Sequence, residues 1–195
     1  LVKKQGIDIL AVHFVNLFNI SKDPETGKLS ARQTADLTGV DLHIENFSFK
    51  MLEMLQDPCF GYGKNINPCI DCRIYQLKKN KKIMEETGAE FVFTGEVLGQ
   101  RPMSQNLKAM ELTAEKSGLG DRILRPLSAK LLKETYAEKN QIIKRDRLLG
   151  LQGRTRKPQL ELAKKFNLKK IPSPAGGCML TDPHMARRIK DQLNH

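Results

Sequence analysis

The chain has 195 residues, of which 39% are hydrophobic and 28% are charged. This length and composition predict a soluble globular protein of about one domain and exclude an intrinsically disordered chain. No apolar run approaches the roughly 20 residues of a membrane span, so we expect no membrane partner. The net charge of +11 favours a polyanionic partner, with a solvated lysine-rich surface as the plainer interpretation.

The first predicted elements are a helix end at 1–6, a buried parallel strand at 7–15, a polar loop at 21–28, a helix at 30–39, a strand at 40–45, a helix at 49–56 and a glycine-rich loop at 59–68. The later ones are a helix at 73–87, a strand at 89–94, a helix at 105–116, a strand at 123–127, helices at 128–139 and 158–166, an extended run at 171–174 and a basic helix from 182.

Capping patterns predict where two of these helices begin. The run from Ser30 to Gln33 has the capping-box pattern, and Ser128 is a candidate cap for the helix that follows it. Strands alternate with helices along the whole chain. This alternation predicts an α/β fold with an open, mostly parallel sheet and helices on both faces.

Three of the four cysteines carry the strongest chemical signal. Cys69 and Cys72 are separated by two residues in the segment 67–72 (NPCIDC), and Cys178 ends the segment 174–178 (PAGGC). We see no secretion signal, so the cysteines indicate a reducing, cytoplasmic setting. In that setting a pair with this spacing is a metal or redox site more often than a structural disulfide.

Three chemistries fit these thiols. A zinc site that uses all four cysteines, Cys59 included, is poorly spaced, because closed zinc sites usually take two pairs. An iron–sulfur cluster with one open iron suits three thiolates. A relay suits Cys72 and Cys178, in which one thiol carries a persulfide and the other resolves it, and Arg73 would favour the thiolate. Cys59 alone is equally well explained as a core thiol.

Other candidate groups accompany the cysteine motifs. The third predicted strand runs into a glycine-punctuated loop at 95–100, and ligands bind at the carboxyl ends of strands in open α/β sheets. His13 and Phe14 are candidate walls of a nucleotide pocket, although a histidine satisfied in the core is the more ordinary interpretation. The basic runs 78–82 (KKNKK) and 154–157 (RTRK) favour phosphate contacts over solvated helix faces.

Together, the segments 67–72, 94–105 (TGEVLGQRPMSQ) and 174–178 resemble the tRNA-thiolating ATP pyrophosphatases. These enzymes belong to the PP-loop, or adenine nucleotide alpha-hydrolase-like, superfamily, which has a Rossmann-like fold. The match is closest to the group labelled tRNA (5-methylaminomethyl-2-thiouridylate) methyltransferase or 2-thiouridylase. The segment 94–105 also resembles the bacterial 4-thiouridine synthase. The resemblance covers residue 7 to about residue 183.

The resemblance implies that ATP, with Mg²⁺, adenylates a carbonyl oxygen of a tRNA uridine and that a sulfur nucleophile then displaces AMP. It makes Cys72 and Cys178 the catalytic, sulfur-handling residues. The 2-thiouridylase pattern has a carboxylate where Cys69 stands, and this departure makes the site resemble iron–sulfur thiolation enzymes. We therefore favour a [4Fe–4S] cluster held by Cys69, Cys72 and Cys178 over a persulfide relay.

The remaining site residues are assigned on the same resemblance. The candidates for the ATP pocket are His13, Phe14, Gly95 and Gln100. The candidates for contacts with tRNA phosphates are Lys78, Lys79, Arg154 and Arg156. A sulfide or persulfide carrier would donate the sulfur. A homodimer is also possible as the assembly of this protein.

The superfamily's pyrophosphate loop, Ser-Gly-Gly-x-Asp-Ser, is not present in this sequence. We expect that loop and the first strand to precede Leu1 in a longer protein, and a chain without the loop to be inactive. Residues 1–195 would then be an incomplete catalytic domain, with 146–195 as a small extension carrying Cys178. The alternatives are a sulfur-inserting enzyme that acts on a small molecule and a zinc-binding, RNA-binding module without catalysis.

Overall fold

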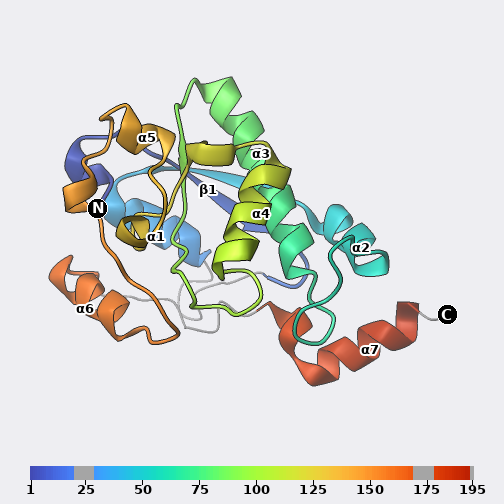
Figure 1. The fold of residues 1–195 in the computed structure, drawn as a ribbon. Coiled ribbons are helices and arrows are strands. Elements are labelled where there is room, and N and C mark those ends of the chain that lie inside the picture. Colours follow the sequence, from blue (N-terminus) through green and yellow to red (C-terminus); the bar gives the residue numbers. More distant parts are fainter. Residues whose placement is uncertain (20–28, 169–177, 194–195) are drawn as a thin grey trace. The chain divides into compact units, whose positions relative to one another are not determined.

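The computed structural model describes residues 1–19, 29–168 and 178–193 (Figure 1). Two predicted segments, the polar loop 21–28 and the extended run 171–174, lie outside the described residues. Among the residues described, none of the helices combines the length and the apolar character that a membrane crossing requires.

The chain divides into two compact units. Unit 1 consists of Leu1–Asp8 and Cys72–Gln159, and unit 2 consists of Ile9–Asp71 and Leu160–His195. The small extension predicted at 146–195 therefore has its first residues in unit 1 and the rest in unit 2. As a separate domain, that extension stays a prediction.

Unit 2 is built on two parallel strands. β1 (Leu10–Val15) pairs along its length with β2 (Asp41–Asn46). Parallel pairing requires a crossover connection, and α1 (Ser30–Thr38) lies in it. The Phe14 ring meets Phe47 edge-on, with 6.0 Å between ring centres, and both side chains are buried. The other elements of this unit are α2 (Ser48–Gln56), most of α6 (Lys157–Lys165), a 3₁₀ turn at Met179–Thr181 and α7 (Pro183–Leu193).

Unit 1 is built on a second, shorter pair of parallel strands, β3 (Val92–Phe93) and β4 (Ile123–Leu124). The long helix α3 (Cys69–Thr87) leads towards β3, and α4 (Leu107–Ser117) lies between β3 and β4 in the chain (Figure 1). Its buried apolar cluster includes Leu77, Met84, Leu119 and Ile123. The remaining elements are α5 (Tyr136–Lys139) and 3₁₀ turns at Lys3–Gln5, Gly120–Arg122, Ala129–Leu131 and Arg145–Arg147.

These elements confirm the predicted α/β class with open, parallel strand pairing. The described strands form two two-stranded sheets, one in each unit. The predicted strands 89–94 and 123–127 are longer than the observed ones. Pro126 cannot donate a ladder hydrogen bond, and the carbonyl of Glu90 accepts from the Arg122 side chain at 2.8 Å.

Two predicted helices differ clearly from the structure at their starts. α3 begins at Cys69 rather than Arg73, because Ile70 extends the buried stripe of Ile74 and Leu77 by one turn. α1 begins at Ser30, as predicted, with Leu29 at its N-cap position, and the capping box of Ser30 and Gln33 stays a prediction. The helix predicted at 128–139 is a 3₁₀ turn and the short α5 instead.

Ser128 explains the last of these differences. Its hydroxyl accepts from the backbone N–H of Leu98 at 2.9 Å and donates to the carbonyl of Leu151 at 2.6 Å. The side chain is fully buried. It therefore joins two chain segments of unit 1 and does not cap a helix.

Candidate functional site

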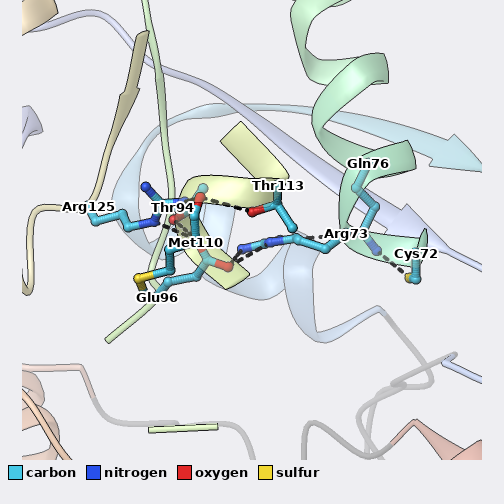
Figure 2. A network of polar contacts seen from close by, with 8 residues as sticks. All are labelled: Cys72, Arg73, Gln76, Thr94, Glu96, Met110, Thr113 and Arg125. Carbon is cyan, nitrogen blue, oxygen red and sulfur yellow. Dashed lines mark hydrogen bonds and ion pairs between the residues drawn. The ribbon is translucent and has the colours of Figure 1, made fainter. Parts of the chain in front are cut away.

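Cys72 lies in the first turn of α3, in unit 1, where a polar network begins (Figure 2). The Gln76 side chain, one turn later, donates from Nε2 to the Cys72 sulfur at 3.4 Å. The Oε1 atom of Gln76 in turn accepts from Nη1 of Arg73 at 3.3 Å. Arg73 thus orients the amide that contacts the sulfur, because an amide whose oxygen is occupied turns its N–H groups the other way.

Glu96 receives the other end of this network. Arg73 donates from Nε to Glu96 Oε1 at 2.8 Å, and its Nη2 lies 2.7 Å from the same oxygen. Arg125 donates from Nε to Oε2 at 2.9 Å, and the Thr94 hydroxyl donates to Oε2 at 3.0 Å. Glu96 comes from the loop after β3, so the network joins that loop to the helix that carries Cys72 (Figure 2).

Glu96 is a buried carboxylate between two guanidinium groups. Its residue is 3% exposed. Burial by itself would raise the pKa of Glu96, but the charges of Arg73 and Arg125 outweigh it and hold the pKa below its ordinary value. Arg125 also donates from Nη2 to the carbonyl of Met110 in α4 at 3.2 Å. The ionised Glu96 therefore organises three elements of unit 1.

The glycine loop after β3 pairs with the segment before the second basic run, also within unit 1. Leu98 forms an isolated parallel bridge with Gln152, and the Gly153 N–H donates to the Leu98 carbonyl at 2.7 Å. Gly99 has φ +76°, and a Cβ built there would lie 3.4 Å from the Gly153 nitrogen. The fold thus brings the loop that contains Gly95 and Gln100 next to the residues just before Arg154 and Arg156.

In unit 2, a hydrogen bond joins the loop before Cys69 to the turn after Cys178. The Asn65 side chain donates from Nδ2 to the carbonyl of Thr181 at 2.7 Å. Asp71 fixes the other end of the same loop, because its two carboxylate oxygens accept from the backbone N–H groups of Cys59 and Phe60, each at 3.1 Å. The loop before Cys69 is therefore bonded to the turn that follows Cys178.

Cys178 directly precedes the 3₁₀ turn Met179–Thr181, which is bonded to the chain after β1. The Met179 N–H donates to the carbonyl of Phe18 at 3.0 Å, and the Thr181 hydroxyl donates to the Cys178 carbonyl at 2.8 Å. The side chain of Asn16 holds this part of the chain by accepting from the Phe18 N–H at 2.8 Å. The residue after Cys178 is thus bonded to the chain that follows the carboxyl end of β1, the end at which α/β sheets bind ligands.

The two predicted pocket residues of β1 have different surroundings. Phe14 packs on Phe47 in the core, and its predicted part in an ATP pocket stays a prediction. His13 keeps a buried Nε2 atom without a hydrogen-bond partner among the described residues. Burial lowers the pKa of His13, so the ring favours its neutral form. A neutral imidazole with a spare nitrogen suits contact with a ligand as well as a core position.

The lysine run on α3 is partly neutralised. Lys81 and Lys82 pair with the glutamates one turn later, with N–O distances of 3.9 and 3.6 Å. Lys79 lies over the Tyr75 ring, 5.8 Å from its centre, and Lys78 is exposed. Of the second run, Arg154 is exposed and Arg156 is half-buried. The predicted phosphate contacts of these residues stay predictions.

No three His, Cys, Asp or Glu side chains in the described parts of the chain form a group that could hold a metal ion. Cys69 and Cys178 belong to unit 2 and Cys72 to unit 1, and all three are partly exposed. Thiolates are the ligands that iron–sulfur clusters take. The donor chemistry therefore fits the predicted cluster, whereas the described geometry gives it no support.

Sequence reasoning missed the centre of the unit 1 network. Glu96 stands inside the segment 94–105, but only its neighbours Gly95 and Gln100 were assigned a role. Arg73 was expected to favour the Cys72 thiolate directly, and in the structure its guanidinium binds Glu96 while Gln76 contacts the sulfur. The available signal was a Glu two residues after a predicted strand and an Arg-Pro pair at the end of the next.

We expect Glu96→Gln to lower the free energy of unfolding by about 3 kcal/mol at pH 7, because it leaves two guanidinium groups without their buried carboxylate. A carboxylate with a lowered pKa stabilises the fold above its unfolded pKa and loses that effect as the pH falls through its folded pKa. The difference from the natural protein should therefore shrink as the pH falls below about 4.5.

Urea unfolding between pH 3 and pH 7 measures this difference. Glu86→Gln, which alters an exposed carboxylate of α3, is the control and should cost well under 1 kcal/mol at every pH. A Glu96→Gln difference that stayed constant over this range would show that the ion pairs do not stabilise the fold.

Comparison with known proteins supplies the family. The sequence model of one family, described as thiamine biosynthesis protein (ThiI), matches residues 1–170. No curated protein and no solved structure matches the chain. This result confirms the resemblance to PP-loop tRNA thiolation enzymes and agrees with the resemblance to the 4-thiouridine synthase. Cys178 lies beyond the matched residues. The protein belongs to the ThiI family, a family of sulfurtransferases with a role in tRNA thiolation.

Proposed function

We propose that this chain is the catalytic domain of an ATP-dependent sulfurtransferase that converts a tRNA uridine to a thiouridine in the cytoplasm. The observation that carries the proposal is the chain of hydrogen bonds from the Cys72 sulfur through Gln76 and Arg73 to Glu96. It gives a cysteine at a helix start a fixed relation to the glycine loop after β3. In such a reaction, the sulfur nucleophile and the nucleotide must be held close together and in the correct orientation.

In the proposed reaction, the uridine carbonyl oxygen attacks the α-phosphorus of ATP and pyrophosphate leaves. The carbonyl carbon then carries an adenylate, which is a far better leaving group than the original oxygen. A sulfur nucleophile adds to that carbon, the carbon–oxygen bond breaks, and AMP departs with the uridine's oxygen. ATP is thus a co-substrate that activates one oxygen for replacement, and Mg²⁺ would neutralise its phosphates.

The proposal assigns the sulfur-handling roles to Cys72 and Cys178. Cys72 lies in the first turn of α3, where the helix dipole favours negative charge, and Gln76 donates an N–H group to its sulfur. Cys178 lies beside the carboxyl end of β1. The position of Cys72 therefore suits a sulfur that must carry negative charge when it attacks.

The nucleotide would bind near the loop of Gly95 and Gln100, which pairs with the segment before Arg154 and Arg156. Glycines at this loop let the backbone approach a phosphate, and arginines bind phosphates with paired hydrogen bonds. His13 and Phe14, which belong to unit 2, stay candidates for ATP contacts. Lys78, Lys79, Arg154 and Arg156 stay candidates for tRNA contacts, which the net charge of +11 supports.

The [4Fe–4S] cluster remains part of the proposal only as a sulfur carrier to be tested. The cluster, if bound, would be held by Cys69, Cys72 and Cys178 and would supply an iron that carries sulfide. No step above depends on it, because the described residues include no metal-holding group. The persulfide relay between Cys72 and Cys178 needs no metal.

A second candidate is sulfur transfer to a small molecule, which the description of the family as thiamine biosynthesis proteins favours. The two candidates differ in how strongly the protein binds tRNA. A tRNA enzyme should bind with an affinity that falls steeply as salt concentration rises, whereas a small-molecule enzyme should not.

We expect Cys72→Ser and Cys178→Ser, made in the protein as the cell produces it, each to abolish thiolation of tRNA. Serine keeps the size of cysteine and cannot carry sulfur. Mass spectrometry of nucleosides from tRNA of cells with only the variant protein measures the product. Cys59→Ser is the matched control, since Cys59 is an exposed cysteine outside the proposed roles. Normal thiouridine levels in both variants would contradict the proposed roles.

Iron analysis of anaerobically purified protein tests the sulfur carrier. If a cluster is present, about four irons per chain and a broad visible absorbance should disappear in Cys69→Ser, Cys72→Ser and Cys178→Ser alike. Iron-free protein that still thiolates tRNA would exclude the cluster and leave the relay.

We expect Gln76→Met to lower the kcat of thiolation about tenfold and to leave KM for tRNA unchanged, because it keeps the volume and removes the N–H group that holds the Cys72 sulfur. Asn80→Ala, one turn further along α3, removes an amide that does not donate to that sulfur. Its kcat should equal that of the natural protein. Equal kcat in the Gln76 variant would contradict a positioning role.

A further inference from the structure

The last described helix, α7, and a neighbouring loop present a basic surface in unit 2 that the proposed function does not use. Its exposed members are Lys64, His184, Arg187, Arg188 and Lys190, and we call this set the α7 basic face. Lys64 belongs with the helix because its neighbour Asn65 donates to the carbonyl of Thr181, which directly precedes Asp182 at the start of α7. Asp182 and Asp191 are the carboxylates on this stretch.

These cations differ from the lysines of α3. Lys81 and Lys82 each pair with a glutamate, whereas Arg187, Arg188 and Lys190 form no ion pair with any described residue. Asp182 is already engaged, because its Oδ1 accepts from the backbone N–H groups of His184 and Met185 at 2.9 Å each. The α7 basic face therefore keeps its positive charge available for an external anion.

The other side of α7 is already covered. Ala186 is 4% exposed, and Met185 and Ile189 are half-buried. These positions fall on one side of the helix, Arg187 lies on the opposite side, and Arg188 and Lys190 lie on the flanks. A helix that binds a membrane surface or a protein groove needs its apolar side for that contact. Only the charged side of α7 is exposed for contact with a partner. This charged side favours a polyanion as the partner.

The helix also has a fixed connection to Cys178. Asp182 caps α7 and follows directly on the 3₁₀ turn Met179–Thr181, whose last carbonyl accepts from Asn65, the residue after Lys64. The Cys178 carbonyl accepts from the Thr181 hydroxyl at 2.8 Å. Cys178, the Lys64 loop and the start of α7 thus form one hydrogen-bonded assembly.

We propose that the α7 basic face binds the phosphate backbone of RNA beside Cys178, so that one anionic strand is held next to a sulfur-handling cysteine. This inference rests on the proposed function, which makes the RNA a tRNA. Each phosphate bound by a cation releases counterions, and this term adds affinity whatever the base sequence. The face positions the RNA and does not read its sequence.

The test is the affinity of the natural protein and its variants for unmodified tRNA, measured by fluorescence anisotropy at several KCl concentrations. The variant Arg187→Gln/Arg188→Gln/Lys190→Gln removes three cations and keeps good helix formers. The control, Lys116→Gln/Lys133→Gln/Lys139→Gln, removes the same charge from exposed lysines of unit 1 that each have a carboxylate partner. Circular dichroism checks that both variants keep their helices.

We expect the α7 variant to bind at least tenfold more weakly near 0.1 M salt, with the slope of log K against log salt reduced by about two to three. The control should change both quantities far less. Equal losses in the two variants would mean a general effect of charge and would overturn the proposal, as would unchanged binding by the α7 variant.

Three outcomes separate this inference from its alternatives. If the natural protein fails to bind tRNA at all, the proposed tRNA substrate fails, and the α7 face loses its ligand with it. If tRNA binds equally well to the natural protein and the α7 variant, only the α7 inference fails. Co-sedimentation with vesicles of phosphatidylserine and phosphatidylcholine tests a membrane instead. Vesicle binding that the α7 variant loses, while its tRNA binding persists, would overturn the proposal in favour of a lipid surface.

Discussion

The burial of one carboxylate between two guanidinium groups holds together much of unit 1. Moving Glu96 out of water is costly, and Arg73 and Arg125 offset that cost only while both are held close to it. The pair therefore requires α3, the loop after β3 and the end of β4 to keep their mutual positions. A buried ion pair adds little net stability over an apolar core, but it penalises other arrangements heavily. Its value here lies in fixing geometry near Cys72.

A second constraint orders the cysteine segments of unit 2. Asn65 binds the turn that follows Cys178, Asp71 binds the backbone at Cys59, and the chain after β1 binds Met179. These bonds set the backbone around the cysteines and do not themselves involve a thiol. Side chains that bond to backbone in this way give loops a defined shape without regular structure.

The distribution of charge refines what a net charge of +11 means. Part of the excess is neutralised on the protein surface, as at Lys81 and Lys82, and part is committed to buried carboxylates, as at Arg73 and Arg125. Among the described residues, the cations that remain for an external anion include those of α7, Lys78 and Arg154. Counting charges along the sequence therefore overstates the surface that nucleic acid could use, and individual contacts decide which runs matter.

The sequence by itself determined the α/β class, the order of most elements and the family, because periodic apolar runs and short motifs such as 67–72 and 94–105 are local properties of the chain. Tertiary structure decided where α3 begins, what Ser128 bonds to, and that Glu96 rather than its glycine neighbours is the electrostatic centre of unit 1. The last two depend on partners far away in the chain, as does the bond between Asn65 and Thr181. Arg125 lies 29 residues from Glu96, and Asn65 lies 116 residues from Thr181. Burial and long-range hydrogen bonding have no local pattern, so only the folded chain reveals them.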